Sequence, residues 1–131
     1  MRRFLMVALC GLGLAGCDVP VSGPAPGQMG QTVPGTGMTV GEAARSFADV
    51  VAAVEPVAEA ECRARAPRLN CDYLIQVDAD RSAPANAFQS LDSAGRPVIP
   101  FTVALIASAE NADELAFVMS HEAAHHIREH L

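Results

Sequence analysis

Residues 18–38 have almost no apolar periodicity and the residues before them have the pattern of a leader, so the folded domain is predicted to be residues 39–131. Two arginines followed by a short apolar stretch are typical of a secretory signal peptide, predicted here as residues 1–16. The stretch is too short for a transmembrane helix, which needs about 20 apolar residues. Residues 17–38, with four prolines and five glycines, are predicted to be a flexible tether.

The leader ends in Leu14-Ala15-Gly16-Cys17, which resembles the lipobox of bacterial lipoproteins. The resemblance implies that Cys17 becomes the lipidated first residue of the mature protein. We then expect a protein of the bacterial cell envelope, anchored to the membrane by lipid and facing the periplasm. An ordinary signal peptide cleaved nearby, or an uncleaved anchor, is the alternative.

The charge balance excludes two classes of partner. After the leader, seven arginines face fifteen acidic side chains, and the chain contains no lysine. The net charge of −8, with histidine neutral, argues against binding to nucleic acid or to an anionic membrane surface.

Two cysteines belong to the expected domain. Cys62 and Cys71 remain once the leader and its Cys10 and Cys17 are set aside. Disulfides persist outside the cytoplasm, so this pair is predicted to be bonded. Zinc binding by the pair is the weaker alternative, because the spacing is not Cys-x-x-Cys.

A first helix is expected over residues 39–65. Thr39 and Glu42 have the spacing of a capping box, and apolar residues follow at helical spacing. Pro56 predicts a kink or a break, and the helix should stop at Ala66.

Three strands are expected after that helix. Residues 73–77 have the composition of a strand, and residues 87–91 and 97–103 flank a turn at residues 92–95 that is typical of a β-hairpin. The prolines of the second hairpin strand predict that residues 97–103 lie at a sheet edge. The expected fold class is α+β, with a small antiparallel sheet between an N-terminal and a C-terminal helix.

The last helix is expected over residues 112–130, after a short helical stretch at residues 103–109. Asn111 is a favourable N-cap, and Leu115 and Met119 give the last helix an apolar face.

The same helix carries the pattern His121-Glu122-Ala123-Ala124-His125. Residues four positions apart lie about 40° apart around a helix, so His121 and His125 share a face and can bind one zinc ion. Glu122 can then act as a general base on a zinc-bound water, as in HExxH peptidases. The alternative is an exposed helical face with two surface histidines.

Residues 86–88 (Asn-Ala-Phe) and residues 111–125 resemble metallopeptidase family 48, the HtpX-like and CAAX-prenyl-protease-like gluzincins. The resemblance implies a zincin-like domain over residues 39–131 that binds one Zn²⁺ and hydrolyses peptide bonds. It also implies a hairpin strand along the active-site cleft. Val98, Ile99 and Phe101 are accordingly expected to pair with an extended protein or peptide substrate.

Gluzincins take their third zinc ligand, a glutamate, from a later helix, and no later helix follows here. We therefore expect a fragment of a longer protein or a non-catalytic remnant, and we expect the 131-residue chain alone to bind zinc weakly and to cleave nothing measurable. On a continuous helix His130 would face the side opposite to His121. His126 and His130 are expected to be a packing or polar-network residue and a surface residue.

The leading hypothesis is therefore a membrane-anchored zinc metalloendopeptidase of the bacterial envelope. A lipoprotein that keeps the protease-like fold as a binding module is the first alternative. A structural or metal-buffering lipoprotein with incidental histidines is the second.

Overall fold

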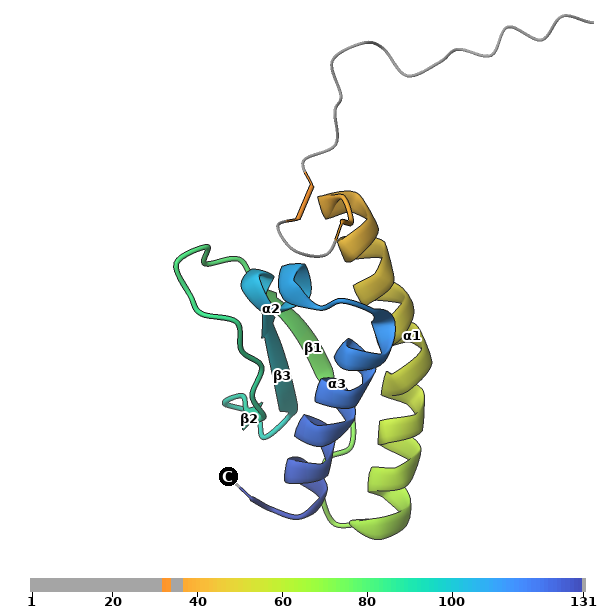
Figure 1. The fold of residues 1–131 in the computed structure, drawn as a ribbon. Helices are drawn as coiled ribbons and strands as arrows, with labels where there is room; N and C mark the ends of the chain where they lie inside the picture. The colour runs from red at the N-terminus through yellow and green to blue at the C-terminus, as the bar shows by residue number, and fades with distance from the viewer. Residues whose placement is uncertain (1–31, 34–36, 131) are drawn as a thin grey trace, which may run out of the picture.

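The computed structural model describes residues 32–33 and 37–130. Its elements are α1 (Val40–Arg65), β1 (Leu74–Asp78), β2 (Ser90–Leu91), β3 (Pro97–Thr102), α2 (Val103–Ser108) and α3 (Ala112–Ile127). α1 and α3 lie side by side and pack against the small sheet (Figure 1). The described part of the chain thus has the α+β fold class expected from the sequence.

α1 begins with the expected capping box. The Thr39 side chain accepts a hydrogen bond from the Glu42 amide, and the Glu42 carboxylate accepts one from the Thr39 amide at 2.7 Å. The helix continues through Pro56, so the expected break is not present. Pro56 and Ala52, whose carbonyl loses its helical partner, are both exposed, and water can hydrogen-bond that carbonyl. α1 ends as expected, with Ala66 as its C-cap.

The three strands lie in the order β1-β3-β2. β1 runs parallel to β3 and β2 runs antiparallel, so the sheet is mixed and the expectation of an antiparallel sheet is wrong. The long connection between β1 and β2, residues 79–89, carries the chain past the position that β3 then fills. A strand's apolar pattern identifies the strand but not its partner, which is why the order was not foreseen.

β3 is the middle strand, and the expectation that residues 97–103 lie at the edge is also wrong. On its outer side β3 pairs with β2, and an isolated bridge joins Ala87 to Phe101. In this register Pro100 lies opposite Phe88. The missing amide hydrogen of Pro100 interrupts the outer ladder there. The proline therefore shortens the neighbouring strand and does not leave β3 unpaired.

The position of β3 also overturns its expected role as the substrate-binding strand. Val98, Ile99 and Phe101 are 8%, 0% and 0% exposed, and β3 has a neighbour on each side. A strand with a neighbour on each side has no open edge to which an extended peptide could add.

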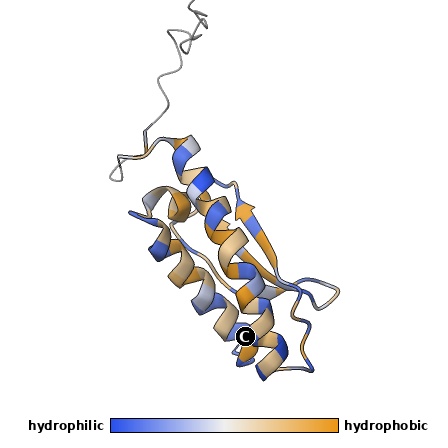
Figure 2. Cartoon of the chain, turned by 90° about the vertical axis from the view of Figure 1, so that its right-hand side faces the viewer, coloured by the Kyte–Doolittle hydropathy of each residue, from blue (hydrophilic) through white to orange (hydrophobic). Residues whose placement is uncertain are grey.

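The core lies between the two long helices and the sheet. Its largest fully buried side chains include Tyr73, Ile99, Phe101, Leu115 and Met119. Hydrophobic and hydrophilic residues alternate around both long helices, as expected for helices with one buried face (Figure 2). The core therefore draws on elements from both ends of the described chain.

A residue of the predicted tether also belongs to this core. Val33 is 5% exposed, its amide donates to the Met38 carbonyl at 2.7 Å, and Thr32 forms a bridge with Thr39. The predicted signal peptide and the predicted lipidation site at Cys17 lie outside the described residues. Among the described residues, no helix combines the length and apolar character needed to cross a membrane.

Cys62 and Cys71 are joined by a disulfide, with their Cα atoms 5.7 Å apart. The bond ties the last turns of α1 to the connection that leads into β1. Both side chains are buried, so the disulfide is part of the hydrophobic core.

Candidate metal centre

α3 is oriented by its cap and by its buried face. The Asn111 side chain accepts a hydrogen bond from the Glu114 amide at 3.1 Å, which fixes the start of the helix. Leu115, Met119 and Ala123 are each no more than 2% exposed. These three residues recur every four positions and set the rotation of α3 about its axis. The adjacent face of the helix, which carries Glu122, is thereby directed toward the outer strand segment, residues 86–91.

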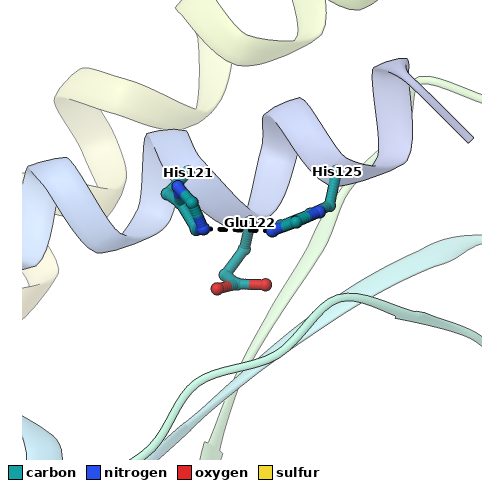
Figure 3. Close-up of side chains that lie close together, drawn as sticks. All are labelled: His121, Glu122 and His125. Carbon is teal, nitrogen blue, oxygen red and sulfur yellow. Dashed lines mark hydrogen bonds between the residues drawn. The ribbon is translucent and has the colours of Figure 1, made fainter. Parts of the chain in front are cut away.

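That next face brings His121, Glu122 and His125 together, as the sequence predicted. The two Nε2 atoms point toward one another across 3.0 Å, with Glu122 between the imidazoles (Figure 3). Their rings are nearly perpendicular, at 84°, and one possible ligand atom from each of the three residues lies within 4.8 Å of the others. Two imidazole nitrogens and a carboxylate at this spacing can hold a metal ion.

Glu122 is held by a residue that sequence reasoning missed. Its Oε2 accepts a hydrogen bond from the backbone amide of Gln89 at 3.0 Å. Gln89 lies in the outer strand segment, between the bridge at Ala87 and β2. A backbone donor has no sequence signature, because any residue except proline could supply it.

His126 lies on the buried side of α3 and joins a polar network. It is 5% exposed, and its Nε2 lies 2.8 Å from the carbonyl oxygen of Asn70. Its Nδ1 lies 3.3 Å from the Gln89 Nε2, and its ring packs edge-on against Tyr73 at 5.5 Å. The expectation of a packing or network role for His126 is thus met.

A hydrogen bond from Tyr73 supports the second half of α3. Its hydroxyl donates a hydrogen bond to the Ala123 carbonyl at 3.1 Å. Burial, and to a smaller extent the negative charge of Glu59, raises the pKa of Tyr73 to about 12. The hydroxyl therefore remains a hydrogen-bond donor throughout the physiological range.

α3 ends at Ile127, three residues earlier than expected. Glu129 adopts a positive φ of 55°, and the amides of Glu129 and His130 donate to the carbonyls of His126 and His125. This is a Schellman ending with glutamate in the left-handed position that glycine usually takes. His130 is exposed, as expected of a surface residue, but the turn places its ring centroid 5.9 Å from that of His125 and not on the side opposite to the histidine pair.

Phe117 forms an exposed aromatic surface beside the site. Its side chain is 71% exposed, and its ring stacks on that of His121 at 6.1 Å with 25° between the planes. Sequence reasoning did not single out this residue, although its position one turn before His121 could have suggested the contact.

Comparison with known proteins decides the family. The family model for peptidase family M48 matches residues 44–131, about two thirds of the chain. The chain belongs to peptidase family M48. The resemblance seen in the sequence is therefore confirmed. No curated protein and no solved structure matches the chain significantly.

M48 proteins are metal-dependent peptidases, and the group of His121, Glu122 and His125 could bind the metal. Among the described residues, no second group of this kind occurs. The M48 site in this chain therefore centres on one face of α3, with the outer strand segment beside it.

Proposed function

We propose that this protein is a zinc-dependent endopeptidase that hydrolyses peptide bonds in protein or peptide substrates. The observation that carries the proposal is the convergence of His121 Nε2 and His125 Nε2 beside the Glu122 carboxylate in an M48 chain. Two facing imidazoles and an adjacent carboxylate are the side chains that zinc hydrolases use.

The residues present fit zinc. Imidazole nitrogen is a preferred zinc donor, and bonds of about 2.0–2.1 Å at the tetrahedral angle place two such nitrogens about 3.3 Å apart. The two Nε2 atoms are 3.0 Å apart, so a small movement of the rings would accommodate the ion. His121 and His125 would supply two of the three protein ligands that are usual in a catalytic zinc site.

When bound, zinc supplies Lewis-acid polarisation and lowers the pKa of a water molecule. In the proposed mechanism the Glu122 carboxylate takes the proton of the attacking water and later delivers it to the leaving amine. The Gln89 amide donates to Glu122 Oε2 and keeps this carboxylate directed into the site.

The outer strand segment, residues 86–91, is the part of the sheet best placed to receive a substrate. It forms the outer side of the described sheet, beside Glu122, and Phe88 and Leu91 are 48% and 44% exposed. We propose that an extended peptide pairs with this segment, so that its scissile bond lies over α3. Phe88→Ala should then raise KM with little effect on kcat.

The experiment uses the protein produced from the intact gene, with casein hydrolysis and metal content measured on the same samples. Glu122→Gln should lower kcat by about 10²–10⁴-fold and leave zinc bound, because it removes the base and keeps the shape. His125→Ala should lose both zinc and activity. A fully active Glu122→Gln protein would show that Glu122 is not the base.

We also propose that the protein is held at the bacterial envelope by a lipid on Cys17. The support is the sequence Leu14-Ala15-Gly16-Cys17, together with the Cys62–Cys71 disulfide, which suits an oxidising compartment. A fatty-acid analogue should label the wild type and leave Cys17→Ser unlabelled. Equal labelling of the two proteins would refute the anchor.

A further inference from the structure

Three polar contacts connect a loop on one side of the domain to the proposed base. His126 Nε2 lies 2.8 Å from the Asn70 carbonyl oxygen, His126 Nδ1 lies 3.3 Å from Gln89 Nε2, and the Gln89 amide lies 3.0 Å from Glu122 Oε2. The contacts join the loop before β1, α3 and the outer strand segment.

The contacts fix the direction of each hydrogen bond. A carbonyl can only accept, so His126 Nε2 carries the proton that the Asn70 carbonyl receives. His126 Nδ1 is then an acceptor for the Gln89 side-chain amide, which also donates to the Ser90 carbonyl at 2.9 Å. Turning the Gln89 amide over would bring two acceptor oxygens together, so its orientation is determined.

One buried atom of this network has no hydrogen-bond partner in the described part of the chain, which costs free energy. The Gln89 Oε1 is buried and has no hydrogen-bond partner among the described residues. An unsatisfied buried acceptor costs about 1–3 kcal/mol, whereas two apolar side chains of similar shape would be nearly neutral. A buried polar pair with an unpaired atom calls for an explanation, and a role in setting geometry provides one.

We propose that His126 and Gln89 are positioning residues that fix the Glu122 carboxylate relative to His121 and His125. The Gln89 side chain is held by His126 and by Ser90, and its own backbone amide holds Glu122. The role in catalysis rests on the proposed function, but the mechanical link between residue 89 and α3 does not.

The outer end of this network is covalently anchored. Asn70 directly precedes Cys71, whose disulfide to Cys62 holds the loop against the end of α1. The Asn70 carbonyl that orients His126 is therefore next to the disulfide, which joins α1 to the connection before β1. A hydrogen-bond network with a fixed outer end can transmit position to its inner end.

The test is the double variant Gln89→Met with His126→Phe, made in the protein from the intact gene. It removes both polar side chains together with the unpaired Gln89 Oε1, but it also leaves the Asn70 carbonyl without its His126 donor, so we expect the two effects to offset and the melting temperature to stay close to that of the wild type. The amide of residue 89 should exchange with solvent about tenfold faster, as measured by NMR, because its acceptor is no longer held in place. The kcat for casein should fall while KM stays unchanged.

Two controls complete the experiment. Glu122→Ala removes the carboxylate that accepts the hydrogen bond from the amide of residue 89, so it should show the largest increase in the exchange rate of that amide. Val50→Ala weakens the core far from the network, so it should lower the melting temperature and leave the native-state exchange at residue 89 unchanged.

Two results would overturn the proposal. Unchanged exchange at residue 89 in the double variant would show that the network does not hold the strand segment, whatever the activity of the protein. Faster exchange with unchanged kcat would show that the network is structural only. The exchange measurement needs no metal or substrate, so its outcome is separate from the fate of the proposed peptidase activity.

Discussion

Replacing Cys62 and Cys71 together by alanine should lower the free energy of unfolding by about 2.6 kcal/mol. The disulfide joins residues nine positions apart, and the loop-entropy model for about nine residues gives about 2.6 kcal/mol at 25 °C. Alanine is preferred to serine because both side chains are buried and a serine would place a hydroxyl in the core.

The assay is urea unfolding followed by far-ultraviolet circular dichroism, together with thermal unfolding. A loss of about 2.6 kcal/mol corresponds to a fall in Tm of roughly 10–20 °C for a domain of this size. Each single alanine variant loses the same bond, so it should show nearly the same loss as the double variant. Reduced wild type provides a control that keeps both sulfur atoms in place.

A loss below about 1 kcal/mol in the double variant would refute the reasoning, because it would mean that the loop is already constrained in the unfolded chain. A reduced wild type as stable as the oxidised protein would refute it as well. A large loss in the variant with none in the reduced protein would assign the effect to packing.

Three further predictions follow from the site and its supports. Because the folded-state pKa of Tyr73 is about 12, the tyrosinate absorbance of this single tyrosine should rise with a midpoint near 12. In the unfolded chain the pKa of the tyrosine is about 10. The contribution of Tyr73 to the free energy of unfolding should therefore be fully present below about pH 10 and be lost as the pH approaches 12, and Tyr73→Phe should remove this loss. Glu129→Gly should raise the unfolding free energy by about 0.5–1 kcal/mol, because glycine adopts the positive φ of 55° without strain, whereas Glu129→Ala should give no gain in the same urea unfolding assay. In the protein produced from the intact gene, removing metal with a chelator should abolish casein hydrolysis and leave the circular dichroism spectrum unchanged, since α3 is held by the core. Added zinc should restore hydrolysis.

The features that local chemistry decides could be predicted from the sequence. The Thr39 cap, the Asn111 cap and the shared face of His121 and His125 each depend on residues within one or two helical turns. The Cys62–Cys71 pair followed from simple counting once the leader was set aside. These features have signatures that single-sequence patterns contain.

The features that depend on distant partners could not be predicted. Pro100 suggested an edge strand, but β3 pairs on both sides, and the proline only interrupts its outer neighbour. Gln89 acts through a backbone amide, which no residue type marks. Glu129 adopts a positive φ, which is unfavourable for a residue with a side chain, so the sequence did not predict the turn that changes the direction of His130.

The placement of α3 has a consequence for substitutions in the core. One face of this helix closes the core through Leu115, Met119 and Ala123, and the adjacent face carries the histidine pair. A shift of one residue in its packing would turn His121 and His125 by about 100° and expose the apolar face at the same time. Substitutions at these buried positions, which touch no metal, can therefore disturb the histidine pair by changing how α3 packs.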